Sequence, residues 1–328
     1  MTLILNASTL HNVLDMPSTV EVVDQIFTNI GNGSASQPDP TAMSVPSADS
    51  TFVLMSAVGG EEGVASVKLL ADIPSNNERG LPSQRSVIML ADHVTGGPLA
   101  ILDGRVPTRM RTAAATAVAT KYLARKDSRI LGLVGAGGLA AAHVEAIKCV
   151  MQIDKIVVWS RTSARIEQFT EAVAEFGIPV EPVDAIEDVF AVSDVVCTLT
   201  PSVEPNIKGE WFRPGQHINA IGSRPRPNER EIDSAGMARA KVIVDHLGTA
   251  KAKSGEYLMA VSEGAITEKD IAGELSAVAA GRIPGRESDE EITLFNSVGI
   301  GALDLAIGRL AYDRAIAQGL GLDFNLSN

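Results

Sequence analysis

Cysteine is scarce in this sequence, which has two in 328 residues, Cys149 and Cys197. Both lie in apolar helix and strand patterns, so we expect buried, reduced thiols and a reducing, cytoplasmic compartment. The five histidines lack ligand spacing, which argues against a metal site. No apolar run reaches the roughly 18 residues that a membrane span needs. The segment Met1–Asn6 lacks the basic start and long apolar core of a signal peptide.

Positive charge is also in short supply. The chain has 28 lysines and arginines against 40 aspartates and glutamates, which gives a formal net charge of −12. We therefore expect no nucleic-acid or anionic membrane partner, since neither suits an unfocused negative field. An anionic small molecule has to be met by a local cluster of arginine and lysine. The length is typical of two domains, each large enough for its own core.

The most informative stretch begins with the apolar run Ile130–Val134, which meets a glycine turn and then an alanine-rich helical pattern. Gly135 permits the tight turn, Gly137 lets the backbone approach a pyrophosphate, and Ala140 allows close helix–strand packing. A second apolar strand, Lys155–Trp159, follows about 20 residues later, as in a βαβ unit. The alternative is a glycine turn that only packs. We predict that a dinucleotide binds at Gly135, Gly137, Gly138, Leu139 and Ala140.

The residues after the second strand determine whether the site prefers NAD or NADP. NAD sites carry Asp or Glu there to accept a hydrogen bond from the ribose 2′-hydroxyl. This chain has Ser160, Arg161 and Thr162 instead, with Arg165 following. Hydroxyl and guanidinium groups suit a 2′-phosphate, so we predict NADP(H) in preference to NAD(H). The alternative is a solvated arginine at a helix start, where a cation is otherwise disfavoured.

The N-terminal part changes from a helical to a strand pattern. Helical spacing predicts an amphipathic helix over Pro17–Ile30, and the polar, proline-marked stretch Ser34–Ser50 predicts a loop. Period-two patterns then predict strands at Thr51–Val58, Val64–Ile73, Ser86–Leu90 and Leu99–Leu102. The short links between them favour a mostly antiparallel sheet, distinct from the βα alternation that begins after residue 120.

Two cations in this part are candidate functional groups. Strand alternation places Lys68 on one face with Val64 and Ser66, so its ammonium lies among mainly apolar neighbours. It is either an edge-strand lysine that discourages aggregation or an amine that binds a carboxylate or moves a proton. Thr108 is a plausible cap of the next helix, which would place Arg111 in the first turn. There the guanidinium either reaches water or shares the helix end with a bound anion.

In the second half, apolar runs alternate with helical patterns, which predicts a doubly wound parallel sheet. The expected strands are Val180–Val183, Asp194–Leu199, His217–Ile221 and Lys241–Asp245. Two strand ends lie on the side where such sheets bind ligands. We expect them to flank the nicotinamide through Thr198, Leu199, Thr200 and Ser223.

A long apolar helix from Gly299 to Gln318 is interrupted by Asp304, which is either a functional acid or a hydrogen-bonded helix residue. We expect this helix to leave the Rossmann domain and to pack onto the first domain. The predicted fold is therefore α/β, with a Rossmann doubly wound sheet and a discontinuous α+β domain. Residues 1–115 and 304–328 form the expected substrate-binding and dimerisation domain, and residues 116–303 form the expected NADP(H)-binding domain.

A set of motifs spans nearly the whole chain. They are Lys68 in its strand, Gly80-Leu-Pro82, Thr95-Gly96, Arg111-Thr-Ala-Ala114, Gly135-Ala-Gly137, Asp194-Val-Val196, Thr198-Leu-Thr200, Glu231-Ile-Asp233, Glu291-Ile-Thr-Leu-Phe295 and Ser297-Val-Gly299. Together they resemble the ornithine cyclodeaminase and mu-crystallin family. The resemblance implies a homodimer formed through the N-terminal sheet, with the active site in the cleft between the domains. It also implies that Lys68 and Arg111 hold the substrate carboxylate. Further expected cofactor contacts are Arg111, Thr112, Val298 and Gly299.

Two departures indicate which members of the family the chain is most similar to. Cyclodeaminases carry an acidic residue where this chain has Arg224, and a guanidinium cannot act as that base. The segments Ser223-Arg224-Pro225 and Ser160-Arg161-Thr162 are more similar to mu-crystallin, whose relatives reduce ketimines with NADPH. Many members also have Pro-x-Arg in the early loop as a carboxylate contact, whereas this chain has Pro38-Asp39-Pro40.

The sequence therefore predicts NAD(P)H-dependent reduction of the C=N bond of a small imino acid, such as a cyclic ketimine carboxylate, or the reverse oxidation of an amino acid. Arg111 and the amides of its helix hold the carboxylate, and Lys68 either donates the proton or polarises the imine. Further candidate substrate contacts are Arg224 and Asp304. Three alternatives stay open: a dehydrogenase for alanine or a basic amino acid, an ornithine cyclodeaminase-type lyase, and an NADPH-dependent binding protein.

Overall fold

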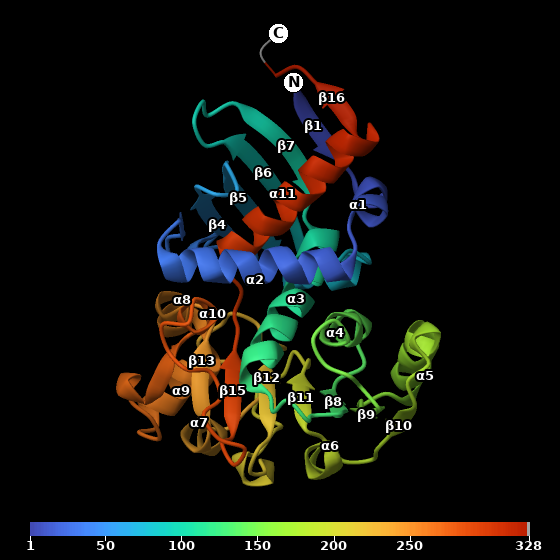
Figure 1. Cartoon of the computed structure of the whole chain (residues 1–328), viewed down its shortest axis with the longest axis vertical. Coiled ribbons are helices and arrows are strands. Elements are labelled where there is room, and N and C mark those ends of the chain that lie inside the picture. The colour runs from blue at the N-terminus through green and yellow to red at the C-terminus, as the bar shows by residue number, and fades with distance from the viewer. Residues whose placement is uncertain (327–328) are drawn as a thin grey trace. The chain divides into compact units, whose positions relative to one another are not determined.

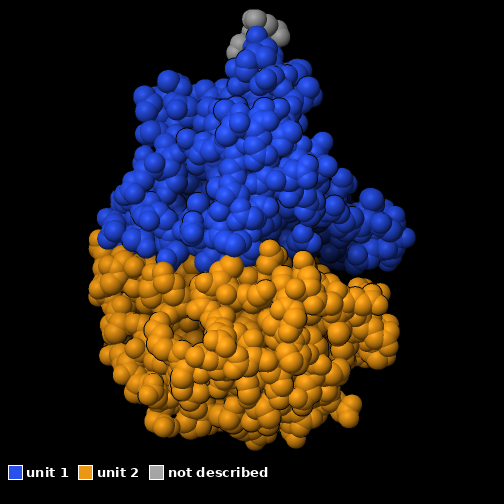
Figure 2. All heavy atoms as spheres, turned by 45° about the vertical axis from the view of Figure 1, so that its right-hand side comes forward, with its two compact units in different colours: residues 1–112, 299–328 blue, residues 113–298 orange. Residues whose placement is uncertain are grey.

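The computed structural model describes residues 1–326, which divide into two compact units (Figures 1 and 2). The first unit consists of Met1–Thr112 and the chain from Gly299 onward, and the second is Ala113–Val298. The chain leaves the first unit within α3 (Arg105–Leu123) and returns just before α11 (Gly301–Gln318). The expected boundaries, at residues 115 and 304, fall in the same helix and in the first turn of α11.

The first unit is built on one eight-stranded sheet in the order β16-β1-β7-β6-β5-β4-β2, with β3 paired to β4. Its strands are β1 (Thr2–Leu5), β2 (Ala35–Ser36), β3 (Thr41–Ser44), β4 (Thr51–Gly59), β5 (Val64–Asp72), β6 (Gln84–Asp92), β7 (Pro98–Asp103) and β16 (Leu322–Phe324). Strands β1 and β7 run parallel, and the other described pairs are antiparallel. The prediction of a mostly antiparallel sheet is confirmed.

The prediction that Ser34–Ser50 is a loop is wrong in part, because this stretch contains β2 and β3. All four residues of β3 are exposed, so backbone pairing to β4 holds the strand without any apolar alternation that a sequence could reveal. Strand β1 was also missed. It is only four residues long and is buried on both faces, so it lacks the alternation of a half-buried strand.

Two helices cover one face of this sheet, as Figure 1 shows for α2 (Met16–Asn32) and α11. The Asp15 side chain caps α2 by accepting from the Ser18 amide, and Gly33 ends it in the left-handed conformation at φ 80°. The helix predicted over Pro17–Ile30 is thus confirmed. In α11 every residue from 301 to 308 is buried, so this half of the helix is a core element. The shorter helices of the unit are α1 (Ala7–Val13) and the 3₁₀ turn η1 (Pro74–Arg79).

The second unit contains an eight-stranded, wholly parallel sheet in the order β10-β9-β8-β11-β12-β15-β13-β14. Its strands are β8 (Ile130–Val134), β9 (Lys155–Trp159), β10 (Val180–Pro182), β11 (Val195–Thr198), β12 (His217–Ala220), β13 (Lys241–Val244), β14 (Ile271–Glu274) and β15 (Thr293–Asn296). The predicted doubly wound sheet is confirmed, although β14 and β15 were missed. The chain winds outward in one direction from β8 and in the other from β11, so the topological switch point lies between these two strands.

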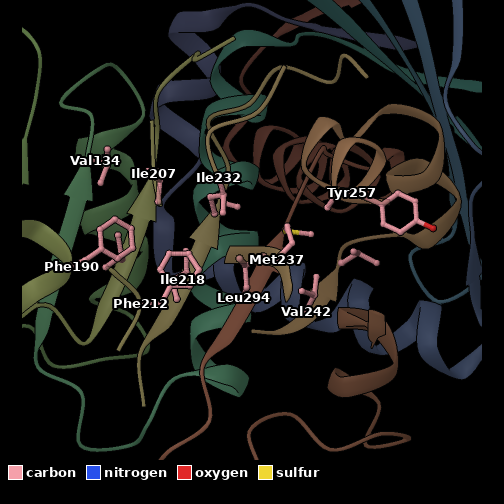
Figure 3. Packing of buried hydrophobic residues seen from close by; sticks show 14 of the residues in the cluster. Val134, Phe190, Ile207, Phe212, Ile218, Ile232, Met237, Val242, Tyr257 and Leu294 are labelled. Atoms are coloured by element: carbon pink, nitrogen blue, oxygen red, sulfur yellow. The ribbon is translucent and has the colours of Figure 1, made fainter. Parts of the chain in front are cut away.

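Helices and 3₁₀ turns surround this sheet. They are α4 (Ala140–Ile147), α5 (Ser163–Val173), η2 (Ala174–Phe176), α6 (Ile186–Val192), η3 (Gly209–Trp211), α7 (Ser234–Arg239), α8 (Leu247–Lys253), α9 (Gly255–Ser262), η4 (Glu268–Asp270) and α10 (Leu275–Ala279). Figure 3 shows the core that side chains of α6, α7 and α9 form with the strands, including the stacked rings of Phe190 and Phe212, whose centroids are 5.4 Å apart. This core fixes the sheet whose carboxyl edge carries the candidate cofactor site.

The two cysteines differ in exposure. Cys197 is buried in β11 as predicted, whereas Cys149 is exposed, so the prediction of two buried thiols is wrong for Cys149. The reason is that α4 ends at Ile147, which leaves Cys149 in the turn after the helix rather than on its apolar face. Among the described residues, no helix is both long and apolar enough to cross a membrane.

Candidate functional site

Lys68 lies in the middle of β5, which is an interior strand paired with β4 on one side and β6 on the other. The edge-strand interpretation of this lysine is therefore excluded. The side chain is 1% exposed, and its Nζ atom is 2.6 Å from Oδ2 of Asp304. Burial of an unpaired ammonium would be costly, so this ion pair is what allows a lysine in the core of the first unit.

Asp304 connects two cations. It lies in the first turn of α11, where the helix dipole favours a carboxylate, and it is completely buried. One of its oxygens contacts Lys68, and the other, Oδ1, accepts from Nε of Arg111 at 3.3 Å. The sequence left open whether Asp304 is a functional acid or a hydrogen-bonded helix residue, and these contacts agree with the second interpretation. The carboxylate is occupied by protein cations, and we expect it to orient them rather than to contact substrate directly.

Arg111 does not lie in the first turn of its helix, so this prediction is wrong. Helix α3 begins at Arg105, whose amide donates to the Asp103 side chain at 3.0 Å, and Thr108 is not its cap. Pro107 could have indicated this start, since proline is typical of a helix's first turn. The amides at the start of α3 therefore cannot bind the same carboxylate as Arg111, contrary to the expectation from the sequence. Arg111 has to act through its own side chain.

Arg111 is buried, with 5% of the residue exposed, and its guanidinium retains unused donors. It donates through Nε to Asp304, and neither Nη1 nor Nη2 has a hydrogen-bond partner within residues 1–326. Both terminal nitrogens lie beside Gly299, where a Cβ would be 3.2 Å from Nη1 and 3.4 Å from Nη2. Gly299 has φ +87°, so its lack of a side chain serves both the backbone and the space around the guanidinium.

The electrostatics of the cluster formed by Lys68, Asp304 and Arg111 suit an incoming anion. Two cations share one carboxylate, which leaves a formal surplus of one positive charge in a buried place. Burial and, to a smaller extent, the charge of Arg111 lower the pKa of Lys68, Asp304 opposes both effects, and the resulting pKa is about 8. An amine with this pKa can both hold and release a proton near neutral pH.

The predicted dinucleotide turn has the backbone that a pyrophosphate needs. Gly135 has φ +115°, and a Cβ there would lie 3.0 Å from the carbonyl oxygen of Leu199. Added Cβ atoms at Gly137 and Gly138 would meet nothing within 4 Å, so the space above both glycines is open. Their amides make no hydrogen bond with the rest of the described chain. Ala140 opens α4 and is fully buried, with Leu139 before it. This arrangement fits a dinucleotide phosphate.

The residues predicted to choose the cofactor follow β9. Ser160 is half-buried, while Arg161, Thr162 and Arg165 are exposed around the start of α5. The Arg165 guanidinium makes a long contact of 3.5 Å with the Gln168 side chain. Arg161 has no ion pair within the described chain, so its charge is available to a ligand.

The predicted residues at the ends of β11 and β12 make their hydrogen bonds to two buried carboxylates. The hydroxyl of Thr198 and both the amide and hydroxyl of Thr200 donate to Glu231, and the hydroxyl of Ser223 donates to Glu256. Sequence reasoning missed both glutamates as functional candidates. The motif Glu231-Ile-Asp233 was the only signal, because nothing local shows that this loop carboxylate is buried.

Other candidate site residues also have partners inside the protein. Arg224 donates through Nε to Glu229 at 2.6 Å, so the predicted substrate contact is part of a local ion pair. The Thr112 hydroxyl donates to the carbonyl of Thr108 within α3 at 2.7 Å. The Val298 amide donates to Asp245 at 2.9 Å. The substrate role of Arg224 and the cofactor roles of Thr112 and Val298 stay predictions.

A parallel sheet with an open glycine turn at its switch point defines the Rossmann class of dinucleotide-binding folds. Residues 1–319 match the ornithine cyclodeaminase/mu-crystallin family, and the chain belongs to this family. Delta(1)-pyrroline-2-carboxylate reductase of Bacillus cereus is 31% identical over 325 residues, which are 97% of this chain and 98% of the relative.

Two solved structures have the same architecture over the full chain. Thermococcus litoralis Delta(1)-pyrroline-2-carboxylate reductase, in complex with NADH and L-proline, superposes with a TM-score of 0.93 at 35% identity and covers 98% of this chain and 100% of its own. An archaeal alanine dehydrogenase dimer with bound NAD gives a TM-score of 0.93 at 33% identity and covers 99% of both chains. The resemblance drawn from the motifs is thus confirmed.

Proposed function

We propose that this protein is an NAD(P)H-dependent oxidoreductase that reduces the C=N bond of a small imino acid or oxidises the corresponding amino acid in reverse. Cyclic ketimine carboxylates are the substrate class that the site fits best. The observation that carries the proposal is the buried cluster of Lys68, Asp304 and Arg111 in a chain whose relatives include an imine reductase and an alanine dehydrogenase. The cluster offers a carboxylate-binding guanidinium beside a proton-donating amine.

In this proposal each member of the cluster has one task. The two terminal nitrogens of Arg111 bind the substrate carboxylate as a fork. Lys68 protonates the imine nitrogen, because a protonated imine accepts hydride more readily. Asp304 holds both cations in place. The bound nicotinamide supplies the hydride, and the turn at Gly135, with the open space above Gly137 and Gly138, holds its pyrophosphate.

The test is the absorbance of the reduced nicotinamide, followed with purified protein, NADPH or NADH, and a panel of cyclic ketimine carboxylates. Oxidation of the cofactor by a cyclic ketimine supports the reductase. An amino-acid dehydrogenase is the second candidate, favoured by the likeness to alanine dehydrogenase. It would turn over with alanine and the oxidised cofactor, or with pyruvate and ammonia. If no substrate of either panel changed the absorbance of the reduced nicotinamide, an oxidoreductase of either kind would be refuted.

We further propose that NADP(H) is preferred, because Arg161 is exposed and uncommitted beside two hydroxyl side chains. Replacement of Arg161 by alanine is expected to raise the Kd for NADPH roughly tenfold and to leave the Kd for NADH unchanged, since only NADPH carries the 2′-phosphate. Fluorescence titration of both cofactors measures the effect. Arg282→Ala, at another exposed arginine of the second unit, is the matched control. An equal change for both cofactors would contradict the assignment.

We also propose a homodimer formed through the sheet of the first unit. Strand alternation directs Lys68 toward the helices, so Leu69, Val87 and Met89 lie on the opposite face, where they are 38%, 40% and 44% exposed. Apolar side chains gathered on one open sheet face are typical of a protein–protein interface. A second copy of the chain is the expected occupant, in keeping with the dimeric archaeal relative.

The variant Leu69→Arg/Met89→Arg is expected to convert the dimer to a monomer, because it places two charges in the apolar interface. Light scattering after size-exclusion chromatography measures the mass. Val192→Arg, at an equally exposed valine of the second unit with 41% exposure, is expected to stay dimeric. A wild-type monomer, or a variant that keeps its dimeric mass, would refute this interface.

A further inference from the structure

Glu231 is the centre of a hydrogen-bond cluster at the carboxyl edge of the parallel sheet, although it is completely buried. Its Oε2 accepts from the Thr198 hydroxyl at 2.6 Å and from the Gly222 amide at 2.8 Å. Its Oε1 accepts from the amide and the hydroxyl of Thr200, both at 2.6 Å. One carboxylate therefore joins the loop that follows β11 to the loop that follows β12.

The loops joined by Glu231 also pack against the dinucleotide turn. A Cβ on Gly135 would lie 3.0 Å from the Leu199 oxygen and 3.3 Å from the Thr200 methyl group. A Cβ on Gly222 would lie 2.3 Å from the Thr200 amide nitrogen. Thr200 thus touches the glycine turn on one side and the β12 loop on the other. Its own position is set by the two hydrogen bonds that it donates to Glu231.

A second buried carboxylate supports the first from behind. Glu256, in the first turn of α9, is 1% exposed and accepts from the Glu231 amide at 2.9 Å and from the Ser223 hydroxyl. Within residues 1–326, no lysine or arginine forms an ion pair with either carboxylate. Two uncompensated acids in one core are costly. Hydrogen bonds alone offset this cost, which singles the cluster out from an ordinary structural ion pair.

We propose that Glu231 is a positioning residue for the nicotinamide half of the dinucleotide site, holding the loops 198–200 and 222–223 in the arrangement that receives this half of the cofactor. The inference rests on the proposed dinucleotide-dependent function. In doubly wound sheets the first turn binds the pyrophosphate, and the strands beyond the switch point serve the second nucleotide. Strands β11 and β12 are the first strands beyond the switch point, and Glu231 fixes the ends of both.

The chemistry of the cluster requires a carboxylate. Four donors converge on the two oxygens of Glu231, and an ionised carboxylate has an acceptor site for each of them. In Glu231→Gln an NH₂ group replaces one carboxylate oxygen, so its N–H donors face the hydroxyl and amide donors that this oxygen accepted from. Glutamine matches glutamate in size, so this variant removes acceptors without opening a cavity. The loops lose their fixed arrangement while the core stays filled.

The experiment compares two ligands in wild type and Glu231→Gln by calorimetric titration. Adenosine 2′,5′-bisphosphate probes the adenosine half alone, and NADPH probes both halves. Displacement of positioned groups costs on the order of tenfold to a hundredfold. We expect the variant to bind NADPH weaker by a factor in that range and to bind adenosine 2′,5′-bisphosphate as tightly as wild type. Arg161→Ala is expected to weaken both ligands, which makes it the complementary variant.

The matched control is Asp233→Asn, two residues along the chain. The Asp233 side chain accepts from the amides of Gly209 and Gly236 and caps α7, away from the loops that follow β11 and β12. Both variants are expected to lower the Tm, but only Glu231→Gln should weaken NADPH. Should Glu231→Gln fail to fold, Thr198→Val removes one donor at constant shape and is expected to weaken NADPH in the same direction.

A pH profile supplies a readout that a purely structural role would not move. Burial and, to a smaller extent, the charge of Glu256 raise the pKa of Glu231, the hydrogen bonds from Thr198 and Thr200 lower it, and the resulting pKa is about 7. The neighbouring Cys197 thiol, with a pKa of about 12, stays neutral in this range. Protonation removes acceptors, so wild-type affinity for NADPH should improve as pH rises through about 7. The profile of Glu231→Gln should lack this step.

Two outcomes separate the inference from the function on which it rests. The positioning role is wrong if a folded Glu231→Gln binds NADPH as tightly as wild type. It is also wrong if the affinity for adenosine 2′,5′-bisphosphate falls by the same factor as the affinity for NADPH. If wild type binds neither NADPH nor NADH, the proposed oxidoreductase function fails first.

Discussion

Replacement of Lys68 by methionine is expected to reduce imine reduction by roughly 10²- to 10⁴-fold, the range that loss of a general acid produces. Methionine keeps most of the side-chain volume in the core and removes the proton donor. Steady-state rates with a cyclic ketimine carboxylate and NADPH measure the loss. Lys269→Met, at an exposed lysine, is the control and should keep the wild-type rate.

The pH dependence identifies the proton that is lost. Because burial and Arg111 lower the pKa of Lys68 to about 8, the protonated amine prevails below that pH and the neutral amine above it. Reduction in wild type should therefore slow as pH rises through about 8, and the reverse oxidation should accelerate. The residual activity of Lys68→Met should show neither the decrease in reduction nor the increase in oxidation as pH rises through about 8.

Loss of Lys68 also leaves Asp304 with Arg111 as its one remaining cation, which can destabilise the core. The double variant Lys68→Met/Asp304→Asn replaces the carboxylate that has lost one partner and restores the formal charge of the wild-type cluster, so it separates misfolding from loss of catalysis. A folded double variant that retains wild-type turnover would remove Lys68 from the mechanism.

Replacement of Arg111 by methionine is expected to abolish the preference for substrates that carry a carboxylate. Wild type should reduce a ketimine carboxylate roughly 10²- to 10³-fold more efficiently than the matching carboxamide, since a fork of two charge-assisted hydrogen bonds is lost in the neutral ligand. In Arg111→Met both compounds should react at the slow carboxamide level. The kcat/KM values of the two compounds give the comparison directly.

Two further variants sharpen this test. Arg111→Lys keeps the charge but not the planar fork, so its preference for the carboxylate should be intermediate. Arg109→Met, in the same helix at an exposed position, should behave as wild type. A strong preference that survives in a folded Arg111→Met would show that another group binds the carboxylate.

Local patterns were sufficient for several elements of this protein. The glycine turn was predictable because Gly135 needs a positive φ that few other residues tolerate. Strand alternation placed Lys68 among apolar neighbours, but only the pairing of β5 on both sides excluded an edge-strand lysine. The start of α3 was missed because Thr108 resembles a cap, whereas Asp103 and Pro107 mark the observed start. Because of this error, Arg111 was assigned to the first turn of α3, where helix amides would help it to bind an anion.

Long-range contacts explain what the sequence could not show. The ion pair between Lys68 and Asp304 joins a strand to a helix near the other end of the chain, and no local pattern reports it. Strand β15 comes late in the chain but lies between β12 and β13, so strand order could not be read from sequence order. Glu231 has the appearance of a solvated loop acid until the two loops that bury it are in place.

The closing helix α11 has a consequence for the order of folding. Residues of the second unit are continuous in sequence, so this unit can fold on the ribosome as soon as Val298 has emerged. Arg111 and Asp304 are 193 residues apart, and the two cations remain without their carboxylate until α11 is made. The earliest-synthesised unit is thus the last to be completed. Nascent chains that stall before α11 would expose an unfinished sheet with two unpaired charges, which makes them natural substrates for chaperones.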